Sequence, residues 1–217
     1  MELINYLGRY FLTKQELLAA TKITEQELSH YQKREVMPKC SYKLQLNVAS
    51  TSFFGLHSTE QEVEYYAKGY ISWLTIVKSL KDVQSIYSLF ETRYKATIEQ
   101  LRLQGHDSKN DKINASIDVH IKEEWQHFLD GIYGLCTKSG LPEDIAAKEF
   151  SILEIKELTA NVEPAKLIEL TEQQLRQLTR AVNLLDSASA LFAPHERLNS
   201  SRHRLVDEIR RKYVLLS

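Results

Sequence analysis

The sequence predicts an all-α, mainly helical protein: an N-terminal helix-turn-helix, with or without a small β wing, followed by a helical bundle of about six helices. Three observations predict this fold class. Only 7 glycines and 4 prolines occur among 217 residues, whereas average proteins contain roughly 7 and 5 per cent of them. Threonine-led capping patterns recur along the chain, and apolar residues return at helical spacing over most of it.

The composition excludes several classes of protein. A β-sandwich or barrel needs a turn every 8–12 residues or so, and this chain has too few turn formers. Hydrophobic residues make up 43% and charged residues 26% of the sequence, which is typical of a globular chain. No apolar run reaches the 18 or so residues of a membrane span, and Glu2 and Arg9 interrupt any signal-peptide core. Cys40 and Cys136 lie too far apart to form a metal-binding pair. We therefore expect a cytoplasmic protein that does not bind a membrane.

Two capping patterns near the N-terminus predict a pair of short helices. In the first pattern, Thr13 would accept a hydrogen bond from the amide of Glu16, and in the second Thr24 would do the same for Glu27. The helices should cover residues near 14–21 and 25–35, joined by a tight turn. A small core between them is expected from the apolar residues Leu17, Leu18, Ile23, Leu28, Tyr31 and Val36. This arrangement is a helix-turn-helix.

The segment Thr13–Pro38 resembles the first two helices of the MerR-type winged helix-turn-helix. The resemblance implies that the second helix enters the major groove of DNA. It also implies a wing hairpin, and the alternation of Tyr42, Leu44, Leu46 and Val48 has the period of a strand leading through Ala49–Ser52 to Phe53 and Phe54. The residues expected to face DNA are Gln26, Ser29, His30, Lys33 and Arg34. Where the family has two glycines and a recognition-helix arginine, this chain has Lys22, Glu35 and Ser29.

Helical periodicity after residue 57 predicts the body of the protein. We therefore divide the chain into a head, residues 1–57, and a body, residues 58–217. Helices are expected from a third capping pattern at Thr59–Glu62 through Val77, from Asp82 to about Gln104, over 115–138, from Pro142, from Thr171 to before Pro194, and from Ser200 or Ser201. Residues 105–114 are polar and suggest a mobile loop.

One predicted helix carries an unusual polar stripe. His120, Glu124, His127, Gly131 and Gly134 follow one another at steps of four and three residues. The two glycines suggest that something approaches the backbone there. Glu124 and His127 have the Glu-x-x-His spacing of di-iron bundles, but the second match needed for such a site, at Glu27–His30, lies on the recognition helix. We interpret the stripe as a structural polar cluster and assign no metal and no cofactor.

A second concentration of charge lies near the C-terminus. Residues 105–164 contain 12 acidic and 6 basic residues, while residues 194–217 contain 3 and 6. Arg202 falls beside the apolar side of the last helix and needs a partner, such as Glu124 or Asp130. One interpretation is an ion-pair lock between the tail and the helix over 115–138. The other is an anion pocket that would hold phosphate or carboxylate. The residues involved are Glu124, His127, His195, Arg197, Arg202 and His203.

The stretches His120–Glu149 and Phe192–Tyr213 resemble a family of uncharacterised bacterial proteins, which brings no residue roles with it. The sequence carries no catalytic motif, so we do not expect an enzyme. The leading hypothesis is a bacterial DNA-binding transcriptional regulator with a MerR-like head and a body that dimerises or binds a small anionic effector. One alternative is a non-catalytic interaction or ligand-binding protein whose helix-turn-helix is structural. The other is a metal-dependent enzyme around His120, Glu124 and His127.

Overall fold

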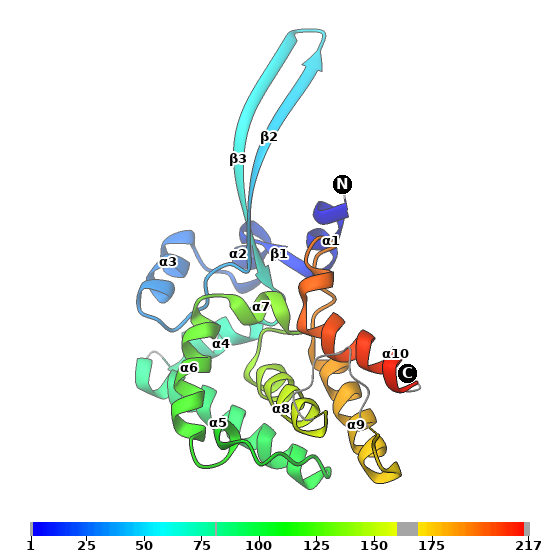
Figure 1. Ribbon diagram of the computed structural model, residues 1–217. Coiled ribbons are helices and arrows are strands. Elements are labelled where there is room, and N and C mark those ends of the chain that lie inside the picture. The colour runs from blue at the N-terminus through cyan, green and yellow to red at the C-terminus, as the bar shows by residue number, and fades with distance from the viewer. Residues whose placement is uncertain (1, 81, 160–168, 215–217) are drawn as a thin grey trace.

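The computed structural model describes residues 2–80, 82–159 and 169–214. The chain begins with a helix, a short strand, a helix pair and a hairpin (Figure 1). These elements are α1 (Glu2–Tyr10), β1 (Phe11–Thr13), α2 (Lys14–Thr21), α3 (Glu25–Lys33), β2 (Tyr42–Ser52) and β3 (Gly55–Ala67). The expected helices at 14–21 and 25–35 are confirmed, the second one ending at Lys33.

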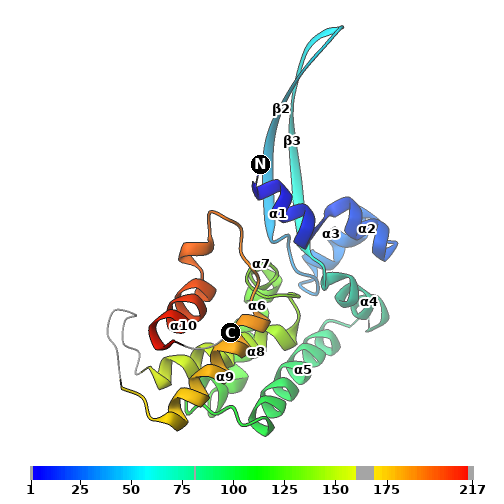
Figure 2. The same cartoon turned by 90° about the vertical axis from the view of Figure 1, so that its right-hand side faces the viewer.

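The three strands form one antiparallel sheet in the order β1-β3-β2. The hairpin pairs continuously from Tyr42 opposite Tyr65 to Ser52 opposite Gly55, with Phe53 and Phe54 at its turn. Its outer half is solvent-exposed, and it extends as a long arm away from the helices in both views (Figures 1 and 2). The expected strand after Pro38 is confirmed, but the all-α fold class is wrong. The protein is mixed α/β, because a hairpin of this length and its pairing with β1 make a true sheet.

The helix expected from the capping pattern at Thr59–Glu62 is wrong over its first half. Residues 55–67 form β3, and the helix begins only at Tyr70. The spacing of Val63, Tyr66 and Tyr70 fits a helix, but Val63, Tyr65 and Ala67 also have the period of a strand. Hydrogen bonds from β2, which lies earlier in the chain, decide between the two patterns. Strand β3 thus runs without interruption across residue 57, the expected end of the head.

The remaining elements form the helical body. They are α4 (Tyr70–Leu80), α5 (Val83–Leu103), η1 (Asp111–Ile113), α6 (Ile117–Leu129), α7 (Ile132–Cys136), α8 (Pro142–Leu158), α9 (Glu172–Ala188), η2 (Arg197–Asn199), the π-helical turn η3 (His203–Asp207) and α10 (Glu208–Tyr213). Helix α8 packs against both α5 and α9. The helix starts expected at Asp82, Pro142 and Thr171 are confirmed, and the last helical segment begins at Ser201. In the described ranges, no helix combines the length and the apolar character that a membrane crossing requires.

The long helix expected over 115–138 is broken in two. Gly131 has a φ of 80° and separates α6 from α7. A Cβ atom at Gly131 would lie 2.6 Å from the carbonyl oxygen of Cys40, and one at Gly134 would lie 2.1 Å from Oγ of Ser41. The expected close approach to these glycines is therefore real, and the approaching segment is the one that connects α3 to β2.

One hydrophobic core joins the head to the body. Leu17 and Leu28 of the helix pair belong to the same buried cluster as Trp73 and Phe128 of the body. Trp73 also donates its indole N–H to the carbonyl oxygen of Val36 at 2.9 Å. The helix pair is thus held by the same core as the bundle.

The polar stretch 105–114 lies against α8. His106 is buried and contacts Glu154, with Nδ1 2.7 Å from Oε2. The hydroxyl of Ser108 donates to Glu157 at 2.7 Å, and Arg102 donates to the carbonyl oxygen of Ile113. These contacts fasten the segment that the sequence suggested as a mobile loop.

Candidate functional site

The helix pair at the base of the hairpin is fixed by two complete capping boxes. The amide of Glu16 donates to Oγ1 of Thr13 at 3.2 Å, and the Glu16 carboxylate accepts from the Thr13 amide at 2.7 Å. Thr24 and Glu27 repeat both bonds at the start of α3 with the same distances. Because each box satisfies amides that the first helical turn leaves free, the two helix starts are set locally.

The five residues predicted to face DNA lie along one side of α3. The side chains of Gln26, His30 and Lys33 are exposed, while Ser29 and Arg34 are half-buried. Four of them line a shallow depression that begins at Thr24. We refer to Gln26, Ser29, His30, Lys33 and Arg34 as the α3 face.

The start of α3 is acidic, but its carboxylates are engaged. Lys14 binds Glu25 at 2.8 Å and Glu64 of β3 at 3.0 Å. The hydrogen bond from Lys14 lowers the pKa of Glu25, and the bonds from Thr24 lower the pKa of Glu27. Both groups are therefore ionised near neutral pH. The cations of the α3 face, Lys33 and Arg34, lie toward the other end of the helix.

The C-terminal arginines form an ion-pair network with α9. Arg202 pairs with Asp186 and with Asp207, the latter at 3.3 Å, and Arg210 binds Asp186 at 2.7 Å. The lock expected between the tail and Glu124 or Asp130 is therefore wrong in its partner, which is Asp186. Asp130 instead binds Lys39 of the head at 2.8 Å.

The other residues expected in an anion pocket also have local partners. His195 lies 3.8 Å from Glu196, and His203 lies 3.4 Å from both Asp207 and Glu208. Arg197 donates from Nε to the carbonyl oxygen of Phe192. Each group is directed at a partner in its own segment, whereas Glu124 and His127 lie together on α6.

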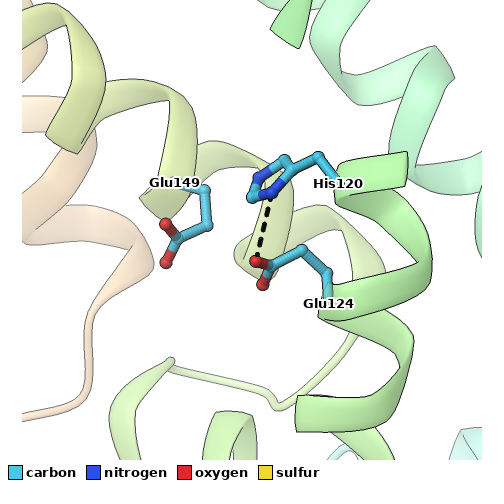
Figure 3. A group of neighbouring side chains, drawn as sticks. All are labelled: His120, Glu124 and Glu149. Carbon is cyan, nitrogen blue, oxygen red and sulfur yellow. Dashed lines mark ion pairs between the residues drawn. The ribbon is translucent and has the colours of Figure 1, made fainter. Parts of the chain in front are cut away.

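A second polar group, the His120 cluster, lies between α6 and α8 and comprises His120, Glu124 and Glu149 (Figure 3). His120 and Glu124 are four residues apart and share one side of α6, and Glu149 faces them from α8. Nδ1 of His120 is 3.4 Å from Oε1 of Glu124, and one donor atom from each of the three residues lies within 4.8 Å of the others. His120 is 2% exposed and Glu124 is 4% exposed.

Burial controls the ionisation of the His120 cluster. It raises the pKa of Glu124 to about 8, with a further contribution from Glu149, and it lowers the pKa of His120. Both shifts favour the neutral forms. Nδ1 of His120 and Oε2 of Glu124 are buried and have no hydrogen-bond partner among the described residues. The buried ammonium of Lys148 lies 3.4 Å from Glu149.

The sequence pattern found only part of this cluster. His127 lies at its edge, half exposed, with Nδ1 3.9 Å from Oε1 of Glu124. Gly131 and Gly134, which continue the stripe in the sequence, contact the 39–41 segment instead. Glu149 was missed, because it joins the cluster through packing of α8 on α6 rather than through spacing along one helix.

A cavity of about 350 Å³ lies where the head meets the body. Tyr6, Tyr10 and Phe11 line it from the head, and Lys138 and Ser189 are among the residues that line it from the body. Its volume falls at the lower end of small-molecule sites. No sequence pattern indicated it, because its wall combines residues far apart along the chain.

The fold and these sites define a mixed α/β protein with a capped helix pair, a long hairpin and a helical body. Residues 86–214 match the family described as "Family of unknown function (DUF6058)". The match covers more than half of the chain, so the protein belongs to this family. No curated protein and no solved structure matches the chain. The expected membership in an uncharacterised family is thus confirmed for the body. The helix pair and the hairpin lie outside the matched residues.

Proposed function

We propose that the protein is a DNA-binding transcriptional regulator in which α3 enters the major groove. The observation that carries this proposal is the exposure of the α3 face. A recognition helix must leave its polar side open to DNA. Gln26, His30 and Lys33 are exposed on one side of α3, and Leu28 on the opposite side is buried and anchors the helix.

Backbone geometry supports the resemblance to the MerR-type winged helix-turn-helix. Lys22 and Glu35 occupy the positions where that family has glycine, and their φ angles are 53° and 55°. Such left-handed angles favour glycine and are uncommon for other residues. Positive φ angles at these two positions support the resemblance, even though the side chains differ.

The chemistry of the α3 face suits a sequence-reading role with few phosphate contacts. Amide, hydroxyl and imidazole groups of Gln26, Ser29 and His30 can exchange hydrogen bonds with base edges. Lys33 and Arg34 can neutralise phosphates. The hairpin, by contrast, contains one lysine and three glutamates over residues 42–67. DNA contact is therefore assigned to α3 rather than to the length of the hairpin.

The cavity between the head and the body supports an effector-binding role for the body. A small ligand there would contact α1 and β1 of the head and the segment after α9 at the same time. A ligand can change DNA affinity only through a difference in its own affinity for two states of the protein. We propose this cavity for the effector, in place of the anion pocket expected at His195, Arg197, Arg202 and His203, because those four groups already contact partners within the chain.

A salt titration tests the DNA proposal. Duplexes are selected from a random pool at about 50 mM salt, and binding of the selected duplex is then measured as salt rises. The double variant Lys33→Ala/Arg34→Ala should bind more weakly. The slope of the logarithm of its binding constant against the logarithm of the salt concentration should be smaller by about two for each bound chain. The matched control is Lys122→Ala/Lys156→Ala, which removes two exposed charges from the body. Equal effects of both double variants, or no duplex retained at low salt, would remove the proposal.

A second candidate function rests on the hairpin turn. Phe53 and Phe54 are 97% and 95% exposed, and the nearby Leu56 is 86% exposed. Exposed apolar groups gathered at one place mark protein contact sites. In this alternative the helix pair is structural and the hairpin binds a second copy of the chain. Light scattering of Phe53→Ser/Phe54→Ser against the native protein tests it: a dimer that becomes a monomer supports the alternative, and an unchanged mass contradicts it.

A further inference from the structure

We propose that the His120 cluster binds a divalent transition-metal ion of the Zn²⁺ class. The site would use Nδ1 of His120 and one carboxylate oxygen from each of Glu124 and Glu149. This inference is independent of the DNA proposal, since α6 and α8 lie outside the helix pair.

Two rigid elements bring the donor atoms together. The four-residue spacing on α6 places His120 and Glu124 one above the other, and Glu149 of α8 completes the group (Figure 3). Zinc bonds of about 2.0–2.2 Å place neighbouring ligand atoms about 3.3 Å apart in a tetrahedron. The 3.4 Å between His120 Nδ1 and Glu124 Oε1 fits that geometry. All three donor atoms lie within 4.8 Å of one another, so at least one of them would move closer to the others when an ion binds.

Unpartnered buried atoms point to the cation as their partner. In the part of the chain that the structure describes, Nδ1 of His120 and Oε2 of Glu124 are both buried without a hydrogen-bond partner. Buried polar atoms are nearly always paired, and an orphan calls for an explanation. A cation held by His120 and Glu124 would satisfy the histidine nitrogen and bring the Glu124 carboxylate into its coordination.

A neighbouring tyrosine is placed to hold the histidine in the required tautomer. The hydroxyl of Tyr94 lies 3.4 Å from Nε2 of His120, and its ring is fully buried. When Nε2 carries the proton and its N–H donates a hydrogen bond to the oxygen of this hydroxyl, Nδ1 keeps a free electron pair for the ion. Ligating histidines commonly use their second nitrogen in this way.

The donor set selects the kind of ion. One imidazole and two carboxylates suit Zn²⁺ and its first-row neighbours, whereas Mg²⁺ and Ca²⁺ prefer oxygen alone. Two carboxylates beside a neutral histidine offset the charge of a divalent cation, and the ammonium of Lys148, 3.4 Å from Glu149, adds one positive charge beside the site. The competing arrangement has no ion: Glu124 takes up a proton and Lys148 alone balances Glu149.

Zinc titration of the full-length protein decides between the two arrangements. The native chain, stripped with a chelator and free of any affinity tag, should bind one Zn²⁺ per molecule and melt at a higher temperature when Zn²⁺ is present. His120→Ala and the milder Glu149→Gln should each weaken Zn²⁺ binding at least about tenfold. His57→Ala, which removes an exposed histidine of the hairpin, should bind as the native chain does.

Circular dichroism of each variant shows whether it has kept its fold, and Glu149→Gln decides the matter if His120→Ala does not fold. Native protein that binds no Zn²⁺, or a folded Glu149→Gln variant with unchanged affinity and stoichiometry, overturns the proposal. Zinc bound elsewhere, for example by the C-terminal histidines, would give the second result.

Discussion

At the scale of single residues, the turn inside the helix pair and the end of its second helix depend on Lys22 and Glu35, whose backbone lies in the left-handed region. Lys22 caps α2 with φ 53° and ψ 47°, and its amide donates to the carbonyl oxygen of Leu18. A left-handed conformation costs a residue with a Cβ about 1–2 kcal/mol. The surrounding core, with Ile23 buried directly after the turn, holds the strained angle in place.

Replacing this lysine by glycine should therefore stabilise the protein. Lys22→Gly is expected to raise the free energy of unfolding by up to about 1 kcal/mol, because glycine adopts the left-handed region freely, although it loses more entropy on folding. Urea denaturation measures the change. Ala19→Gly, an exposed position inside α2, is the matched control and should lower stability by about 1 kcal/mol. Equal losses in both variants would contradict the strain argument.

The same residue scale explains why the metal-site proposal could not come from spacing alone. His120, Glu124 and His127 form a visible stripe in the sequence, yet the structure puts His127 at the edge and brings in Glu149 from another helix. A single sequence shows which residues share a helix face, but not which face of α8 packs on it. The burial that raises the pKa of Glu124 is likewise a property of that packing.

At the scale of elements, capping within one turn decides some structures and pairing between strands decides others. The pattern of a threonine followed three residues later by glutamate occurs at Thr13, Thr24 and Thr59. It starts α2 and α3 but lies inside β3 in the third case. The first two helix starts were predictable because all of their hydrogen bonds are local. The third prediction failed because the backbone around Thr59 pairs with β2 across the hairpin instead of forming a helical turn with its own neighbours.

Substitution of the two threonines separates these cases. Thr24→Ala should destabilise the protein by about 1 kcal/mol near neutral pH, because the amide of Glu27 loses its acceptor. Thr59→Ala removes the same sequence pattern at a position inside β3, where no helix begins. The free energy of unfolding should therefore fall by clearly less. Thermal unfolding of the two variants provides the comparison. Losses of equal size would mean that the cap at α3 contributes little.

The pH dependence of the α3 cap follows from Glu27. Bonds from Thr24 lower the pKa of this carboxyl below its ordinary value of 4.5. A lowered pKa contributes stability that is present above the ordinary value and is lost as the pH falls through the lowered one. The difference between native protein and Thr24→Ala should therefore shrink under acidic conditions. Thr24→Ala keeps the amide bond to Glu27 and loses the hydroxyl bond. A difference that stays constant from neutral pH to well below 4.5 would therefore show that the hydroxyl bond contributes nothing.

At the scale of the whole molecule, the helix pair and the bundle share one buried cluster. Trp73 contacts the head through Val36, and Lys39 of the head binds Asp130 at the end of α6. The local sequence pattern predicted the starts of α5, α8 and α9, although it also predicted a helix where β3 lies and one unbroken helix over 115–138. It could not predict the shared core or the cavity beside it, which depend on contacts between distant segments.

A shared core predicts that the head and the body unfold together. Leu28→Ala, in the centre of α3, should lower stability by about 2–5 kcal/mol, because the leucine is fully packed. Hydrogen exchange followed by mass spectrometry should show reduced protection in α5 and α8 as well as in α3. Loss of protection confined to residues 14–36 would indicate that the head unfolds on its own.

Nuclear magnetic resonance tests most directly the proposal that α3 contacts DNA. Amide signals of the protein are followed as a selected duplex is added in steps. If α3 binds in the major groove, the signals of Gln26 to Arg34 should shift first. They should shift less in the Lys33→Ala/Arg34→Ala variant at equal duplex concentration. Shifts confined to the hairpin turn or to α9 and α10, with α3 unchanged, would contradict it.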